Sequence, residues 1–149
     1  MTAITNDTEF RRQLEGLDYA RQRAAARFIE HVLDLCDDER IGRVAKVAAN
    51  PNASADELAT ALHSARAAAI DSHARCGADS DWKEQAGYFV ARAATAAVSP
   101  EGQVAAGPAW QAAMSSRMAQ TSMAIETPED TAGQERLAQY RILSEFLNA

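Results

Sequence analysis

Residues 54–77 read SADELATALHSARAAAIDSHARCG, and this stretch decides the fold class. Ser54 and Glu57 have the Ser-x-x-Glu spacing of a capping box, in which each side chain accepts from the other residue's backbone N–H at a helix start. Behind them, apolar and small residues recur every three or four positions, as one face of an α-helix requires: Leu58, Leu62, Ala65, Ala69, Ser72 and Cys76. We expect Gly77 to end this helix as its C′ residue.

The same spacing continues on both sides of this stretch, and no segment alternates as a strand does. We therefore expect about six helices, over about residues 6–36, 41–48, 54–76, 82–97, 108–125 and 130–147. Gly16 predicts a kink or break in the first, because glycine costs about 1 kcal/mol in a helix interior. Short connections favour antiparallel neighbours. The predicted fold is all-α, with one compact domain over residues 1–149 and a flexible N-terminus over residues 1–7.

Alanine accounts for 34 of the 149 residues, whereas Leu, Ile, Val and Phe together account for 25. Such a composition excludes a β-sandwich or barrel, which needs many β-branched and aromatic residues. Two alanine-rich segments are locally alike, SARAAA at residues 64–69 and VARAAT at residues 90–95. A helix-pair repeat or close helix packing through alanine would explain the likeness, and close packing is the simpler interpretation.

The charge pattern and motifs exclude several classes of function. The net charge is −6, and no segment is strongly basic, so we expect no nucleic-acid binding. There is no run of 18 apolar residues and no secretory signal at the start, so we expect no membrane span and a cytoplasmic location. No phosphate loop, dinucleotide fingerprint, paired CxxC or HExxH pattern is present. We predict no cofactor, no metal site and no enzymatic activity.

His73 and Cys76 form the only pair with metal-ligand spacing on one helix. The pair is half of a zinc site, and further ligands would have to come from His31, Cys36 or Asp34. A Cys–His nucleophile is a second interpretation. Both cysteines fall on predicted buried faces, where a thiol is inert, so the preferred interpretation is packing. His73 and Cys76 remain candidates for lining a ligand pocket.

An acidic cluster stands where the first two predicted helices meet: Asp34, Asp37, Asp38 and Glu39. Its plainer interpretation is a solvated helix end with an N-cap. Its functional interpretation is a docking surface for a basic partner, because like charges on one side steer association. Trp82, Trp110, Met114 and Met118 are expected in the core before any partner surface.

Residues 23–35, RAAARFIEHVLDL, resemble a helix of a family of bacterial immunity proteins from polymorphic toxin systems. Similar segments follow in the same order at residues 38–41, 67–75 and 91–97, so the resemblance covers roughly residues 20–100. It implies a small, alanine-rich, all-helical protein that neutralises a toxin by binding it. Among site residues, it directs interest to His73 alone.

Three hypotheses for function follow. The first is a non-enzymatic protein that binds another protein, such as a toxin. The second is a small-ligand-binding protein or enzyme with a pocket between helices near His73 and Cys76, which predicts a concave cavity with convergent polar groups. The third is a structural homodimer joined by helix faces.

Overall fold

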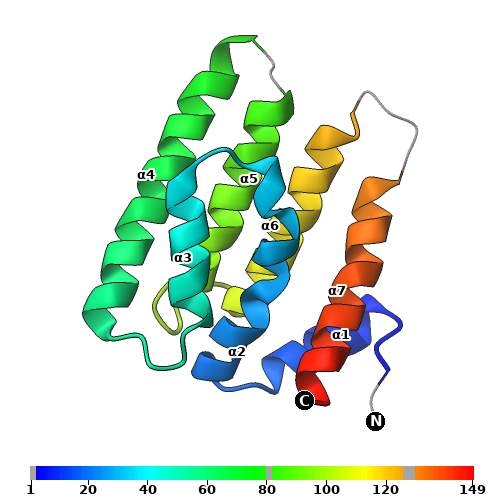
Figure 1. The fold of residues 1–149 in the computed structure, drawn as a ribbon. Helices are drawn as coiled ribbons and strands as arrows, with labels where there is room; N and C mark the ends of the chain where they lie inside the picture. The colour runs from blue at the N-terminus through cyan, green and yellow to red at the C-terminus, as the bar shows by residue number, and fades with distance from the viewer. Residues whose placement is uncertain (1–2, 80–81, 126–129) are drawn as a thin grey trace.

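The computed structural model describes residues 3–79, 82–125 and 130–149, and for residues 76–79 the backbone alone. Within these ranges every regular element is a helix, which confirms the all-α prediction (Figure 1). The elements are α1 (Asp7–Glu15), α2 (Tyr19–Ala25), the 3-10 helix η1 (Ala26–Leu35), α3 (Glu39–Ala49), α4 (Ala55–Asp79), α5 (Trp82–Ala97), α6 (Pro108–Met123) and α7 (Thr131–Leu147).

The predicted first helix is three elements in the structure. Gly16 is the C-cap of α1, so the break expected there is confirmed. A new helix then begins at Tyr19, where the Asp18 side chain accepts a hydrogen bond from the Arg21 N–H at 2.9 Å. From Ala26 the chain continues as the 3-10 helix η1, which three-four apolar spacing does not distinguish from an α-helix.

The capping signals at the two ends of α4 have different outcomes. Ser54 and Glu57 form the reciprocal capping box, with N···O distances of 3.0 Å to the Ser54 hydroxyl and 3.3 Å to the Glu57 carboxylate. The prediction that Gly77 ends this helix is wrong, because α4 continues to Asp79. Glycine stops a helix where the backbone turns left-handed, and otherwise only weakens it.

The helices form two layers (Figure 1). In one, α4, α5 and α6 lie side by side, with α5 antiparallel to both of its neighbours, as expected for consecutive helices. In the other, α3 and the α2–η1 rod cover one face of this layer. The helix α7 packs beside α6, and α1 lies across the end near both termini.

The core consists of two clusters. The larger lies between the two layers and is mostly alanine, with Ile29, Val32, Ile41 and Val90 among its larger members. Alanine therefore brings helices close together, as predicted. The smaller cluster is built around the aromatic rings of Phe10, Phe28 and Tyr140.

Within residues 1–7, where we expect a flexible segment, Ile4 belongs to the smaller cluster, and the flexibility of the segment stays a prediction. Its side chain is buried, and its backbone N–H lies 3.4 Å from the Ser144 hydroxyl of α7. Asp7 already belongs to α1. Burial of one large apolar side chain contributes about 1.5–3 kcal/mol, enough to hold a short arm.

Helix α7 buries Tyr140 and Leu143, as its apolar spacing favours, but it also buries two polar side chains and leaves one leucine exposed. Glu135 and Gln139 are buried, whereas Leu137 is 62% exposed. Their partners come from distant elements: Glu135 pairs with His31, and Gln139 donates to the Ala113 carbonyl. The buried face of α7 therefore includes polar side chains whose partners lie on other helices.

The large residues expected in the core also lie partly outside it. Met118 is 45% exposed, so its assignment to the core is wrong, while Met114 packs against the smaller cluster. Trp110 is half-buried beside Phe10, and Trp82 is half-buried.

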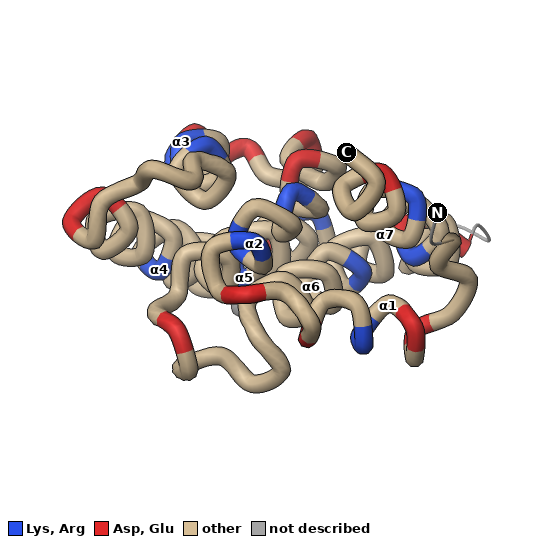
Figure 2. The backbone as a smooth tube through the Cα atoms, turned by 90° about the horizontal axis from the view of Figure 1, so that it is seen from below, with Lys and Arg blue, Asp and Glu red and all other residues tan. Residues whose placement is uncertain are grey.

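Charged residues are scattered over the helices, with acidic and basic side chains interspersed (Figure 2). None of the helices in the described part combines the length and apolarity that a membrane-spanning segment needs.

Candidate functional site

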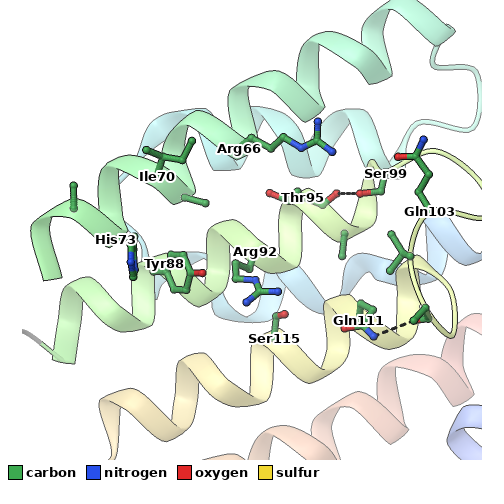
Figure 3. Close-up of a pocket in the computed structure, with 15 residues that line it drawn as sticks. Arg66, Ile70, His73, Tyr88, Arg92, Thr95, Ser99, Gln103, Gln111 and Ser115 are labelled. Atoms are coloured by element: carbon green, nitrogen blue, oxygen red, sulfur yellow. Dashed lines mark hydrogen bonds between the residues drawn. The ribbon is translucent and has the colours of Figure 1, made fainter. Parts of the chain in front are cut away.

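A cavity of about 670 Å³ opens between α4, α5, the turn that follows α5, and α6. We call it the groove. It lies on the face of α4 and α5 opposite to α3 (Figure 3). Volumes of about 300–1,000 Å³ are typical of small-molecule sites.

Each long wall of the groove is one face of a helix, with the three-four spacing that aligns side chains. The residues from α4 include Arg66, Ile70 and His73. The second wall follows α5 and the residues just after it, and includes Tyr88, Arg92, Thr95 and Ser99. The opposite side of α5 is buried against the other layer, so α5 is shared between the core and the groove.

The turn over residues 98–107 closes one end of the groove and is held in place by side chains of α2 and α6. The Tyr19 hydroxyl donates to the Ser99 carbonyl at 2.7 Å, and the Gln111 carboxamide donates to the Ala105 carbonyl at 3.0 Å. Ala106 has a φ of 64°, which is uncommon for a residue other than glycine. Strained backbone of this kind persists where surrounding contacts fix it, and it gathers at ligand sites.

Gly107 ends this turn with a φ of 90° and directly precedes Pro108, the first residue of α6. A Cβ atom at this position would collide with the Gln22 carboxamide. Both the conformation and the close approach therefore favour glycine. Pro108 stands at N1, as its missing N–H allows.

The hydroxyl groups of Thr95 and Ser99 are used within their own stretch of chain. Thr95 donates to the Ala91 carbonyl at 2.8 Å, and Ser99 donates to the Thr95 carbonyl at 2.7 Å, as the dashed line in Figure 3 shows. His73 packs its ring against Tyr88 with the centroids 5.2 Å apart. The Arg92 guanidinium lies 5.9 Å from the Tyr88 ring centre. The groove therefore has an aromatic end formed by His73 and Tyr88, and the hydroxyl groups of Thr95 and Ser99 already donate to backbone carbonyls.

The charge of the groove differs from that of the whole protein. Its lining includes Arg66, Arg92 and His73, and none of its lining residues is acidic. Neither arginine forms an ion pair with a described residue. By contrast, Arg40 pairs with Asp38 at 2.6 Å and with Asp71 at 2.8 Å.

The structure places His73 in the groove, as the small-ligand hypothesis expected. The side chain of Cys76 lies outside the described residues, so the His73–Cys76 pairing stays a prediction. Cys36 is half-buried against Gly87, and burial raises the pKa of its thiol, which makes it a weaker nucleophile at neutral pH.

The further ligands considered for a metal site do not gather around His73. His31 Nδ1 lies 2.6 Å from the Glu135 carboxylate, across the η1–α7 interface. No group of three or more His, Cys, Asp or Glu side chains suited to a metal ion occurs in the part of the chain that the structure describes.

The acidic cluster is divided between structural and exposed groups. Asp38 caps α3 by accepting from the Arg40 N–H at 3.0 Å, and hydrogen bonds from the Arg40 guanidinium lower the pKa of its carboxyl. Asp37 lies 3.3 Å from Lys83. Asp34 and Glu39 are exposed. The helix-cap interpretation holds for Asp38, and docking by the other carboxylates stays a prediction.

Arg66, Tyr88 and Arg92 are groove residues that the sequence reasoning did not select. A signal was present, because the two arginines occupy matching positions in the like segments SARAAA and VARAAT. Alanines of both segments pack in the core. The arginines between them face the groove.

No protein family, curated protein or solved structure matches this chain, so its resemblance to bacterial immunity proteins stays a prediction.

Proposed function

We propose that this chain is a non-enzymatic binding protein and that the groove is its binding site. The observation that carries the proposal is a cavity of about 670 Å³ in which two arginines without ion pairs to described residues stand beside uncovered apolar surface. Ile70 lines this cavity and is 68% exposed. A large apolar side chain at a concave polar-rimmed site is the pattern of a ligand site.

Binding fits the polar groups of the groove better than catalysis does. A nucleophilic hydroxyl needs an adjacent base to take its proton. The Thr95 and Ser99 hydroxyls instead donate to backbone carbonyls four residues earlier in the chain. The remaining polar groups, led by the two arginines, are of the kind that orients a bound ligand.

Titration with Nile red, a neutral apolar dye, tests the groove without presupposing ligand charge. We expect a saturable rise in its fluorescence with the wild-type protein. Ala69→Trp places an indole in the groove and should weaken dye binding at least about tenfold, because it removes the apolar area that the dye covers. Ala59→Trp is the matched control, since Ala59 is an exposed residue of the same helix outside the groove.

Circular dichroism and thermal unfolding first establish that both variants are folded. Should Ala69→Trp unfold the protein, Ala74→Trp replaces it, because Ala74 lines the groove at an exposed position. Absence of saturable dye binding, or equal binding by the groove variant and Ala59→Trp, would overturn the proposal.

A protein partner is the second candidate function. Three carboxylates at the η1–α3 junction, Asp34, Asp37 and Glu39, are exposed where a basic surface could approach them. The immunity-protein resemblance makes a toxin the expected partner. Co-expression with a toxin encoded beside this chain tests it: protection should be lost on Asp34→Lys with Glu39→Lys and kept on Asp56→Lys, an exposed control on α4.

A further inference from the structure

Three features of the groove together specify the chemistry of its ligand. The first is charge. Arg66 from α4 and Arg92 from α5 both line the groove, on opposite sides of Thr95 in the view of Figure 3, with Arg92 toward Ser115. The protein carries a net charge of −6, yet the groove lining has no carboxylate. An anion here meets two cationic side chains and no like charge from the lining.

The second feature is that these two arginines form no ion pair with a described residue. Several other arginines of the chain are paired: Arg11, Arg12, Arg40, Arg75 and Arg117 each lie within 2.9 Å of a carboxylate. Arg66 and Arg92, like Arg43 and several other arginines, form no ion pair with a described residue, and Arg92 lies against Tyr88. A guanidinium presents a planar fork of donors that matches a carboxylate. Their donors are available to a ligand.

The third feature is the apolar surface beside the arginines. Ile70 lies one turn from Arg66 on α4 and is largely uncovered. Ala69 and Ala96 leave room between the walls, and the contacting, tilted rings of His73 and Tyr88 close the far end. From Tyr88 to Ser99 the groove runs about 16 Å, at about 1.5 Å per helical residue. This space suits a medium-length apolar body.

We infer that the groove takes a small amphipathic carboxylate, whose head group is bound by Arg66 and Arg92 and whose apolar body lies along Ile70 toward the His73–Tyr88 pair. The inference rests on the proposed function, since it names the ligand class of the same site. An acidic peptide would share the charge. The cavity volume of about 670 Å³ favours a small molecule instead.

Isothermal titration with two single-chain amphiphiles of opposite charge and similar chain length tests the inference. We expect decanoate to bind at one site below its micelle concentration and decyltrimethylammonium to bind at least about tenfold more weakly, because the second brings a cation to two guanidinium groups. Decanoate binding should weaken as salt is raised.

Arginine variants locate the head group. Arg66→Gln and Arg92→Gln should each weaken decanoate binding about tenfold, the size expected for a lost charge-assisted hydrogen bond. Arg43→Gln removes the same charge from an exposed arginine of α3 outside the groove and should leave binding unchanged. All three positions are exposed, so the fold should tolerate each substitution.

Several outcomes overturn the inference and leave the proposed function standing. One is binding of the cation as tight as that of decanoate. A second is an equal effect of the groove and Arg43→Gln variants. A third is saturable Nile red binding that Ala69→Trp weakens, without any decanoate binding. A fourth is the same dye result with binding of an acidic amphipathic peptide in place of decanoate. If the wild-type protein binds neither Nile red nor decanoate, the proposed function is overturned as well.

Discussion

Asp7 ties three helices together, and its replacement by asparagine is the sharpest test of the described packing. The Arg117 guanidinium of α6 donates to both carboxylate oxygens of Asp7, at 2.8 and 3.0 Å. The Tyr140 hydroxyl of α7 donates to the same carboxylate at 2.7 Å. Arg117 also donates to Gln139, so α1, α6 and α7 share one polar network. Asp7→Asn keeps the shape of the side chain and removes its charge.

The structure sets the size of the effect. Hydrogen bonds to charged groups contribute about 1.5–3 kcal/mol each to stability. The Asp7 side chain is 43% exposed, and the carboxamide introduced by Asp7→Asn would still accept one bond. Solvent screening therefore places the expected loss near the low end, at about 1.5 kcal/mol. An unfolding entropy of about 2.1 cal/mol/K per residue converts this loss to roughly 5 °C in Tm for a chain of this length.

The effect should depend on pH in one direction. Hydrogen bonds from Arg117 lower the pKa of Asp7 below its ordinary value. A carboxyl with a lowered folded-state pKa adds stability above its unfolded-state pKa, and the contribution is lost as pH falls through the folded-state pKa. Wild type should therefore exceed Asp7→Asn in Tm above about pH 5, and the difference should shrink progressively at lower pH.

Thermal unfolding followed by circular dichroism at pH 7 and at several acidic pH values measures both quantities. Asp56→Asn is the control, because Asp56 also stands in the first turn of a helix and makes no hydrogen bond or ion pair with a described residue. The same helix-dipole contribution is lost in both variants. An equal loss of Tm in the two, or a wild-type advantage that is undiminished at about pH 2, would refute the reasoning.

Two further stability predictions follow from single contacts. Gly42→Ala should raise the unfolding free energy by about 1 kcal/mol, because a Cβ there meets nothing within 4 Å in the interior of α3. Gly107→Ala should lower the unfolding free energy by about 1–3 kcal/mol, because of the positive φ and the clash with Gln22. Chemical denaturation measures both changes, and two changes of the same sign would contradict this expectation. His31→Ala should cost about 1–3 kcal/mol by leaving the buried Glu135 carboxylate with only the 3.5 Å contact from the Gln120 carboxamide, and the same change should cost little in a Glu135→Leu background. A double-mutant cycle measures this coupling, and a coupling near zero would show that the pair does not hold α7 to η1.

Local structure could be predicted from the sequence wherever the interacting groups are neighbours in the chain. Ser54 and Glu57 of the capping box stand three positions apart, and the break at Gly16 follows from the propensity of a single residue. The alanine faces of α4 and α5 likewise follow from helical spacing, and both helices do bury alanines against their neighbours. These features need only the geometry of one helix.

The errors arose where a distant partner decides the orientation of an element. Apolar spacing in α7 favours burial of Leu137, yet Glu135 is buried because His31, 104 residues away, provides its partner. The arm at Ile4 is packed because α7 returns beside it. Helical periodicity indicates which face of a helix is apolar. It does not indicate which groups on other helices will provide hydrogen-bond partners for polar side chains.

The candidate site likewise has some features that follow from the local sequence and others that depend on distant parts of the chain. The sequence by itself determined that the chain is helical, that alanine would bring its helices close together, and that His73 lies on a helix face. Only the tertiary structure decided that the faces of α4 and α5 carrying Arg66, His73 and Arg92 would border a shared cavity. The physical reason is that helix formation is a local event along about 3.6 residues per turn. A cavity depends on which helices pack side by side and on how much of each face their neighbours leave uncovered.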